Sequence, residues 1–128
     1  MRILGIDYGL KKIGLAISEG ELAEPLGVIN AIRNTQYAIR KIKAICDKDG
    51  IEKIVVGISE GKMAEKQRKF GRELAKITSL SVEFQDETLT SQDAIAKMIQ
   101  AGKRRKFRRQ FQDAVAAAII LQSWLDKN

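Results

Sequence analysis

Hydrophobic residues near the start of the chain fall into short runs. Three runs, each typical of a β-strand, occupy residues 3–7, 13–18 and 26–32. Gly9 lies in the short link between the first two runs, where a hairpin turn is expected. Three successive strands with short links predict an antiparallel meander. The only proline, Pro25, comes just before the third run, where a strand start tolerates its missing N–H.

The spacing of apolar residues changes after the third run. Apolar residues recur three and four positions apart over 38–46, which predicts an amphipathic helix that ends near Gly50. The continuous apolar run at 51–59 is typical of a strand that is covered on both faces. A second amphipathic helix is expected over 63–77, and the alternating run at 81–87 predicts a fifth strand.

Two more helices complete the predicted order of elements. One begins at an N-cap supplied by Thr90 or Ser91, and the last runs from about Phe111 to Trp124 with an apolar middle that we expect to be buried. The resulting order is β-β-β-α-β-α-β-α-α. A meander followed by crossover connections predicts a mixed sheet, antiparallel on one side and parallel on the other, with helices on both faces. We expect residues 1–128 to form a single α/β domain.

Composition narrows the chemistry that the chain can perform. It contains no histidine and one cysteine, Cys46. The lack of histidine excludes serine–histidine and cysteine–histidine nucleophile pairs and histidine-ligated zinc. Cys46 falls on the apolar side of a predicted helix, so we expect a buried thiol in a reducing compartment. Because no stretch resembles a signal peptide or a membrane span, we expect a cytoplasmic protein that does not engage a membrane.

Positive charge is concentrated in one run of the sequence. The net charge is +7, and the run KRRKFRR at 103–109 carries six basic residues and no acidic one, which leaves only +1 for the rest of the chain. Concentrated positive charge attracts polyanions, and nucleic acid is the default partner. The alternative is a solvated loop that binds nothing. The basic residues of this run are Lys103, Arg104, Arg105, Lys106, Arg108 and Arg109.

Three acidic residues stand at places where a joint site would form. Asp7 ends the first strand, and ligands of open α/β sheets bind beyond the carboxyl ends of the strands. Glu87 ends the fifth predicted strand, on the same edge of the sheet. Asp113 lies in the first turns of the last helix, where Ala116 and Ala117 allow close approach to the sheet. We expect the three carboxylates to converge, with a hard divalent cation to offset the cost of their burial.

Each of these acids also has a purely structural interpretation. Asp7 could hydrogen-bond its own backbone in the hairpin. Glu87 could be a solvated charge at a strand end, and Asp113 could interact with the helix dipole. The coincidence of all three on one edge of the sheet favours a joint site.

Three segments, in this order and spacing, resemble one family. GIDYGLKKIGLAIS, DETLTSQDA and DAVAAAIILQSWLD are similar to motifs of the YqgF (RuvX) family, described as Holliday-junction resolvases and as pre-16S rRNA processing nucleases. The resemblance covers essentially the whole chain. It implies a ribonuclease H-like fold with a five-stranded mixed sheet in the order 3-2-1-4-5, and it implies that Asp7, Glu87 and Asp113 are the catalytic acids and metal ligands.

The chain departs from the family pattern at two places. The family usually follows its fourth strand with a GLP turn, whereas this chain has GISEGK, which brings in Glu60. Related resolvases keep their second acid at the end of the fourth strand, so Glu60 is a rival to Glu87. Thr88 stands where the family usually has an arginine, which removes one expected phosphate contact.

The resemblance implies hydrolysis of phosphodiester bonds with two Mg²⁺ or Mn²⁺ ions. Lys12 and the 103–109 run would hold the backbone of the substrate, either structured RNA such as pre-rRNA or branched DNA. Both a monomer and a homodimer are open, because symmetric resolution of a four-way junction calls for two active sites and RNA processing does not. We expect the last helix, with Trp124 near its end, to close the core rather than to form a dimer contact.

Two other classes of function are open at this point. Ribonuclease H-like domains also serve as nucleic-acid-binding modules without catalysis, and the presence of all three acids argues against that role here. GIDYG also resembles a phosphate-binding loop of actin-like ATP-binding and sugar-kinase lobes. Those proteins place the nucleotide between two such domains, and this chain has room for one.

Overall fold

The computed structural model describes residues 1–31, 34–87, 94–97 and 112–128. Its elements, in chain order, are β1 (Ile3–Tyr8), β2 (Lys12–Ser18), β3 (Ala23–Asn30), α1 (Thr35–Asp49), β4 (Lys53–Ile58), α2 (Lys62–Thr78), β5 (Ser81–Asp86) and α4 (Gln112–Lys127). Residues 94–97 are helical as well. The remainder of the helix predicted to start at Thr90 or Ser91 lies outside the described residues.

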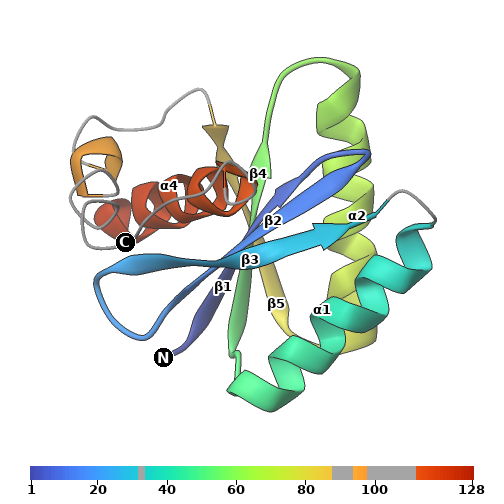
Figure 1. Cartoon of the computed structure of the whole chain (residues 1–128), viewed down its shortest axis with the longest axis horizontal. Coiled ribbons are helices and arrows are strands. Elements are labelled where there is room, and N and C mark those ends of the chain that lie inside the picture. Colours follow the sequence, from blue (N-terminus) through green and yellow to red (C-terminus); the bar gives the residue numbers. More distant parts are fainter. Residues whose placement is uncertain (32–33, 88–93, 98–111) are drawn as a thin grey trace.

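The five strands form one mixed sheet in the order β3-β2-β1-β4-β5 (Figure 1). β1 pairs with β2, and β2 with β3, in antiparallel fashion, whereas β1 with β4 and β4 with β5 are parallel pairs. The antiparallel meander and the strand order expected from the sequence are therefore confirmed.

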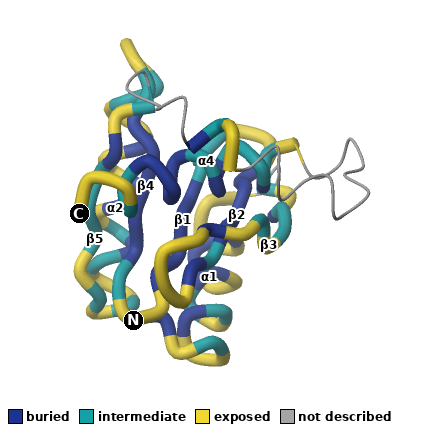
Figure 2. Tube along the Cα trace, turned by 90° about the vertical axis from the view of Figure 1, so that its left-hand side faces the viewer, coloured by how far each residue is buried: buried dark blue, intermediate teal, exposed yellow. Residues whose placement is uncertain are grey.

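Helices cover both faces of the sheet, as predicted. α1 and α2 lie on one face and α4 lies on the other (Figure 1). Alternate residues of each strand supply the two cores, with Leu4 and Ile6 of β1 facing α1 and α2, and Ile3 facing α4. Figure 2 shows the central strands buried and the outer sides of the helices exposed.

The start of β4 differs slightly from the sequence prediction. Gly50 adopts a left-handed conformation and ends α1, as expected. The N–H of Ile51 then donates a hydrogen bond to the carbonyl oxygen of Cys46, 3.0 Å away. Ile51 therefore belongs to the helix cap, and β4 starts two residues later than the apolar run.

Cys46 is buried in α1, and burial raises the pKa of its thiol to about 11, so it stays protonated.

The start of the third strand was predicted incorrectly. β3 begins at Ala23, so Pro25 lies inside the strand and faces Ala16 across the ladder. β3 is an edge strand, which can accommodate a residue without an N–H. The pairing of β2 with β3 is irregular between Leu15 and Ala16, next to the proline.

The last helix packs into the core, as the sequence indicated. Ala117, Ala118 and Leu121 of α4 are fully buried, and Trp124 packs partly buried against the same cluster. None of the helices in the described part of the chain combines the length and apolar character that a membrane span requires.

Candidate active site

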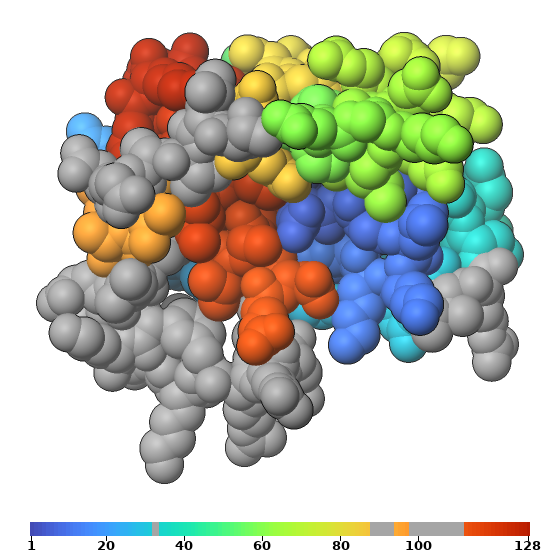
Figure 3. Space-filling model, turned by 90° about the horizontal axis from the view of Figure 1, so that it is seen from above, coloured from blue at the N-terminus to red at the C-terminus, as the bar shows by residue number. Residues whose placement is uncertain are grey.

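The carboxyl ends of β1, β4 and β5 meet at one edge of the sheet, which we call the site rim. The parallel registers of β1 with β4 and of β4 with β5 bring these ends together. Figure 3 looks onto this rim: the β1–β2 hairpin in blue, the start of α2 in green and the start of α4 in orange lie around it. Ligands of open α/β sheets bind at such an edge.

Asp7 and Glu87 are neighbours at the site rim. Asp7 is the fifth residue of β1, and Glu87 directly follows β5. Both side chains line one pocket, and a hydrogen bond with Glu87 is one cause of the raised pKa of Asp7. Two carboxyl groups can hydrogen-bond only when one of them carries a proton. The nearness of Glu87 therefore favours the protonated form of Asp7.

The environment of Asp7 favours its protonated form strongly. The pKa of Asp7 is raised from 3.8 to about 7, first by burial, then by the hydrogen bond to Glu87, and then by the charges of Glu87 and Asp113. Asp7 and Glu87 line a pocket of about 280 Å³ whose other walls are Ile95, Ala116, Ile119 and Ile120. This mainly apolar wall explains why burial is the largest cause.

Small residues in the strands make room for the acids. A Cβ atom added at Gly57 would lie 2.7 Å from Oε1 of Glu87, and one added at Gly5 would lie 2.7 Å from Cβ of Leu121. A Cβ at Gly14, which pairs with Asp7 in the ladder, would overlap the backbone carbonyl oxygen of Asp113. These glycines were not among the predicted site residues, although a glycine inside a strand often marks the close approach of another segment.

Asp113 lies near this pair but does not complete a cluster with it. It is the second residue of α4 and partly buried, and its charge acts on Asp7. It does not line the pocket that Asp7 and Glu87 share. Among the described residues, no three cysteine or acidic side chains are grouped closely enough to hold a metal ion. The structure thus brings two of the three predicted acids into contact, with the third close enough to add charge.

Glu60 occupies a different environment from Glu87. It lies two residues after β4 and is exposed. It does not line the pocket beside Asp7, and it is not among the groups that raise the pKa of Asp7. Of the two rival acids, Glu87 is therefore the neighbour of Asp7.

The hairpin that follows Asp7 presents two lysines to solvent. Lys11 and Lys12 are both exposed. The hairpin is held by hydrogen bonds from the N–H of Gly9 to the carbonyl oxygen of Lys12 (3.1 Å) and from the N–H of Ala31 to that of Lys11 (2.9 Å). The other predicted contact residues, the 103–109 run and the substituted position Thr88, lie outside the described residues.

Gln67 of α2 ties two strand ends of the site rim together. Its Oε1 accepts a hydrogen bond from the N–H of Ser59 (2.8 Å), and its Nε2 donates one to the carbonyl oxygen of Tyr8 (3.4 Å). Its side chain is buried, with 2% exposed. The ring of Phe70, on the same helix, packs 4.5 Å from that of Tyr8. Gln67 was not among the predicted site residues, although a polar residue on the apolar side of a predicted helix is a usable signal.

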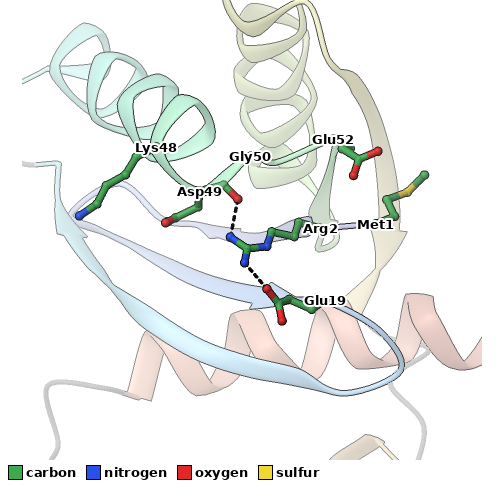
Figure 4. Close-up of a pocket in the computed structure, with 7 residues that line it drawn as sticks. All are labelled: Met1, Arg2, Glu19, Lys48, Asp49, Gly50 and Glu52. Atoms are coloured by element: carbon green, nitrogen blue, oxygen red, sulfur yellow. Dashed lines mark hydrogen bonds and ion pairs between the residues drawn. The ribbon is translucent and has the colours of Figure 1, made fainter.

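The opposite edge of the sheet, which we call the far rim, has a different chemistry (Figure 4). It holds an open pocket of about 560 Å³ lined by Met1, Arg2, Glu19, Lys48, Asp49, Gly50 and Glu52. Arg2 forms an ion pair with Glu19 and donates a hydrogen bond to the carbonyl oxygen of Asp49 (2.8 Å). Although this pocket is larger, its charges have opposite signs and neutralise one another. The like-charged acids are at the site rim.

Comparisons with known proteins agree with this arrangement. A protein of Agathobacter rectalis named "Putative pre-16S rRNA nuclease" is 38% identical and covers 98% of this chain and 95% of its own length. A protein of the same name from Pelotomaculum thermopropionicum is 40% identical, with 98% and 87% covered.

Solved structures share the fold at much lower identity. The fowlpox virus Holliday junction resolvase superposes with a TM-score of 0.70 at 13% identity and covers 100% of both chains. T. thermophilus RuvC in complex with a Holliday junction substrate gives a TM-score of 0.67 at 12% identity, with 99% of this chain and 96% of that chain covered. These likenesses confirm the ribonuclease H-like fold. The sequence model of the RuvX family, described as Holliday junction resolvase, matches residues 1–127, and the chain therefore belongs to this family.

Proposed function

We propose that this protein is a metal-dependent nuclease that hydrolyses phosphodiester bonds in structured nucleic acid. The favoured reaction is processing of the 5′ end of pre-16S rRNA. The relatives that are 38% and 40% identical to this chain are named as nucleases of pre-16S rRNA. Resolution of branched DNA, named for the family, is the second. The observation that carries the proposal is the contact of Asp7 with Glu87 in a pocket at the site rim, where the pKa of Asp7 is raised to about 7.

The donor atoms at the site rim suit a hard divalent cation. Asp7, Glu87 and Asp113 offer only carboxylate oxygens, which are the ligands that Mg²⁺ and Mn²⁺ prefer. We propose that these three residues hold two such ions. When bound, the ions lower the pKa of a water molecule and stabilise the charge on the leaving oxygen.

The protein prepares this site by concentrating negative charge. Because the pKa of Asp7 is raised to about 7, cation binding competes with protonation of its carboxyl group. The apolar wall formed by Ile95, Ile119 and Ile120 keeps water from one side of the pair, which strengthens its attraction for a cation. The exposed Lys11 and Lys12 offset the repulsion between the acids and an approaching phosphate.

The proposal is tested by cleavage assays with purified protein and Mg²⁺ or Mn²⁺. The substrates are a pre-16S rRNA fragment with an extended 5′ end and a four-way DNA junction. We expect cleavage of at least one of them, and we expect Asp7→Asn to abolish it while binding of the same substrate is kept. Glu60→Gln serves as the control, because Glu60 lies outside the pocket, and it should cut within about twofold of the wild type.

Two outcomes would contradict the proposal. Normal cleavage by Asp7→Asn would remove Asp7 from the mechanism. Binding without cleavage of either substrate, with Mg²⁺ and with Mn²⁺, would favour a nucleic-acid-binding module without catalysis.

The same assays separate the two substrates. Symmetric cutting of the junction requires two active sites, so we expect it only if the protein sediments as a homodimer. A monomer that cuts the RNA and leaves the junction intact would support the RNA reaction.

A further inference from the structure

The outer side of α2 carries a concentration of positive charge that is separate from the site formed by Asp7 and Glu87. The helix contains six basic and two acidic residues, a net charge of +4. All six basic residues are exposed, and Arg68 rests over the ring of Phe84. The other five form what we call the α2 basic face: Lys62, Lys66, Lys69, Arg72 and Lys76.

The charge of the whole chain emphasises this concentration. Residues 103–109 contribute +6 and α2 contributes +4 to a total of +7, so the remainder of the chain is net negative by 3. The net charge of the chain outside residues 103–109 is only +1, because acidic residues elsewhere offset the +4 of α2. The positive charge of this protein therefore lies in two segments rather than one.

The α2 basic face has no acidic partner within the part of the chain that the structure describes. The ion pairs there involve Arg2, Lys43, Lys53 and Lys97, none of which belongs to α2. Glu65 and Glu73 lie four positions before and after Lys69, where a helix allows pairing, but neither pairs with it. These cations are open to an external anion.

The α2 basic face begins at the site rim. α2 starts four residues after β4, and the hydrogen bonds of Gln67 to Ser59 and Tyr8 fix its first turns against the strand ends. Figures 1 and 3 both show the start of α2 beside the β1–β2 hairpin, which carries Lys11 and Lys12. A line of cations thus leads from the acid pair along the outside of the molecule.

The repeat along this line fits a nucleic-acid duplex. Lys62, Lys69 and Lys76 recur every seven residues, so they lie on nearly the same side of the helix. At about 1.5 Å per residue the line from Lys62 to Lys76 is about 21 Å long. This length corresponds to about six base pairs of a duplex at about 3.4 Å per pair.

We propose that the α2 basic face and the hairpin lysines bind the phosphate backbone of a duplex arm that leads away from the cleaved bond. The proposal rests on the proposed function for the class of substrate. Lysines on a regular helix contact phosphates without reading bases, so this surface recognises a duplex arm by its shape and charge. It would position the same substrate whether the arm belongs to a junction or to a folded RNA.

The test measures binding separately from cleavage, in the Asp7→Asn background. Lys62→Gln/Lys69→Gln is compared with Lys48→Gln/Lys127→Gln, which removes the same charge from exposed residues at the ends of α1 and α4. Affinity for a four-way DNA junction and for an RNA hairpin is measured by fluorescence anisotropy at several salt concentrations. The folded state of each variant is checked by circular dichroism.

We expect the α2 variant to lose about tenfold in affinity at low salt and its salt dependence to flatten. Each lost phosphate contact lowers the slope of log K against log salt by about 0.9, so two lysines should lower it by nearly two. The control variant should keep the slope of its parent. Equal losses in both variants would mean that only net charge matters, and no loss in either would mean that the duplex lies elsewhere; either result overturns the proposal.

The design keeps the two proposals separable. If the wild type cuts no substrate but the two variants still differ in salt slope, the proposed function fails, whereas binding of a duplex by the α2 basic face stands. If the wild type cuts and the α2 variant binds like its control, the α2 proposal fails alone.

Discussion

The two edges of the sheet are both polar, but they handle charge in opposite ways. At the far rim, opposite charges are paired: Arg2 with Glu19, and Lys53 with Glu83 at 2.6 Å. At the site rim, Asp7 contacts another acid, Glu87, and feels the charge of Asp113. The same sheet therefore has one edge where opposite charges are paired and one edge where acidic side chains lie together.

This difference indicates which edge of the sheet is the better candidate for binding a ligand. Opposite charges near a surface add little to stability and require nothing further. Like charges held close together destabilise the folded state. A fold keeps such an arrangement where a bound group offsets the repulsion. The smaller pocket, and not the larger one, is therefore the better candidate site.

The functional difference between the two edges is tested most directly by removing one acid from each edge. Glu87→Gln should lower the cleavage rate on the order of 10²-fold, because a charge that would hold the cation is lost. Glu19→Gln, at the far rim, should change the rate by less than about twofold, because it only breaks an exposed ion pair. Rates are measured at saturating substrate and metal. Similar losses in both variants would show that the two edges do not differ in function.

A second comparison concerns the space beside two glycines, Gly14 of β2 and Gly27 of β3, which lie on neighbouring rungs of the same ladder. Gly14→Ala should destabilise the protein on the order of 2–3 kcal/mol, because its Cβ overlaps the backbone of α4 at Asp113. Gly27→Ala, in the edge strand β3, has open space around it and should stay within about 1 kcal/mol of the wild type. Urea unfolding measures both changes.

Cleavage by the two glycine variants gives a second measure of the close approach of α4 to the sheet. Gly14→Ala should also lose cleavage beyond its loss of stability, because α4 must shift at the residue that carries Asp113. A Gly14→Ala protein as stable and active as Gly27→Ala would mean that α4 does not need its close approach to the sheet.

The fold could be predicted from the sequence because local patterns carry it. Strand alternation, helical spacing and the order of elements are properties of neighbouring residues, and they sufficed for the sheet order 3-2-1-4-5. The placement of Asp7 and Glu87 on one edge followed from the ends of two strands in a parallel arrangement. Their contact is therefore a consequence of topology that a sequence pattern can reach.

The features that were missed depend on contacts between distant parts of the chain. Gln67 hydrogen-bonds Tyr8 across 59 positions, and Gly14 is required by a backbone atom of Asp113. Neither contact leaves a periodic signal. Pro25 was placed outside its strand because the pattern of apolar residues does not show which strand lies at an edge.

The smallest expected effect separates the two edges by the sign of their pH dependence. The folded state raises the pKa of Asp7 from 3.8 to about 7, so it binds a proton that the unfolded chain has released between these values. Stability from this group is complete below about pH 4 and is lost as the pH rises through about 7. At the far rim, the hydrogen bond from Lys53 lowers the pKa of Glu83, so its contribution is present above the ordinary value of 4.5 and is lost as the pH falls.

Urea unfolding in EDTA, between about pH 5 and about pH 8, tests the sign at the site rim. We expect the metal-free wild type to lose on the order of 1–2 kcal/mol over this range, less than the full shift would give, because Asp7 is partly solvated. Asp7→Asn should remove most of this slope. Mg²⁺ should stabilise the wild type more at the higher pH, where the carboxylates are free of protons, and should not stabilise Asp7→Asn. If the wild type and Asp7→Asn showed the same pH profile, the acids at the site rim would carry no excess cost, and the contrast with the far rim would lose its physical basis.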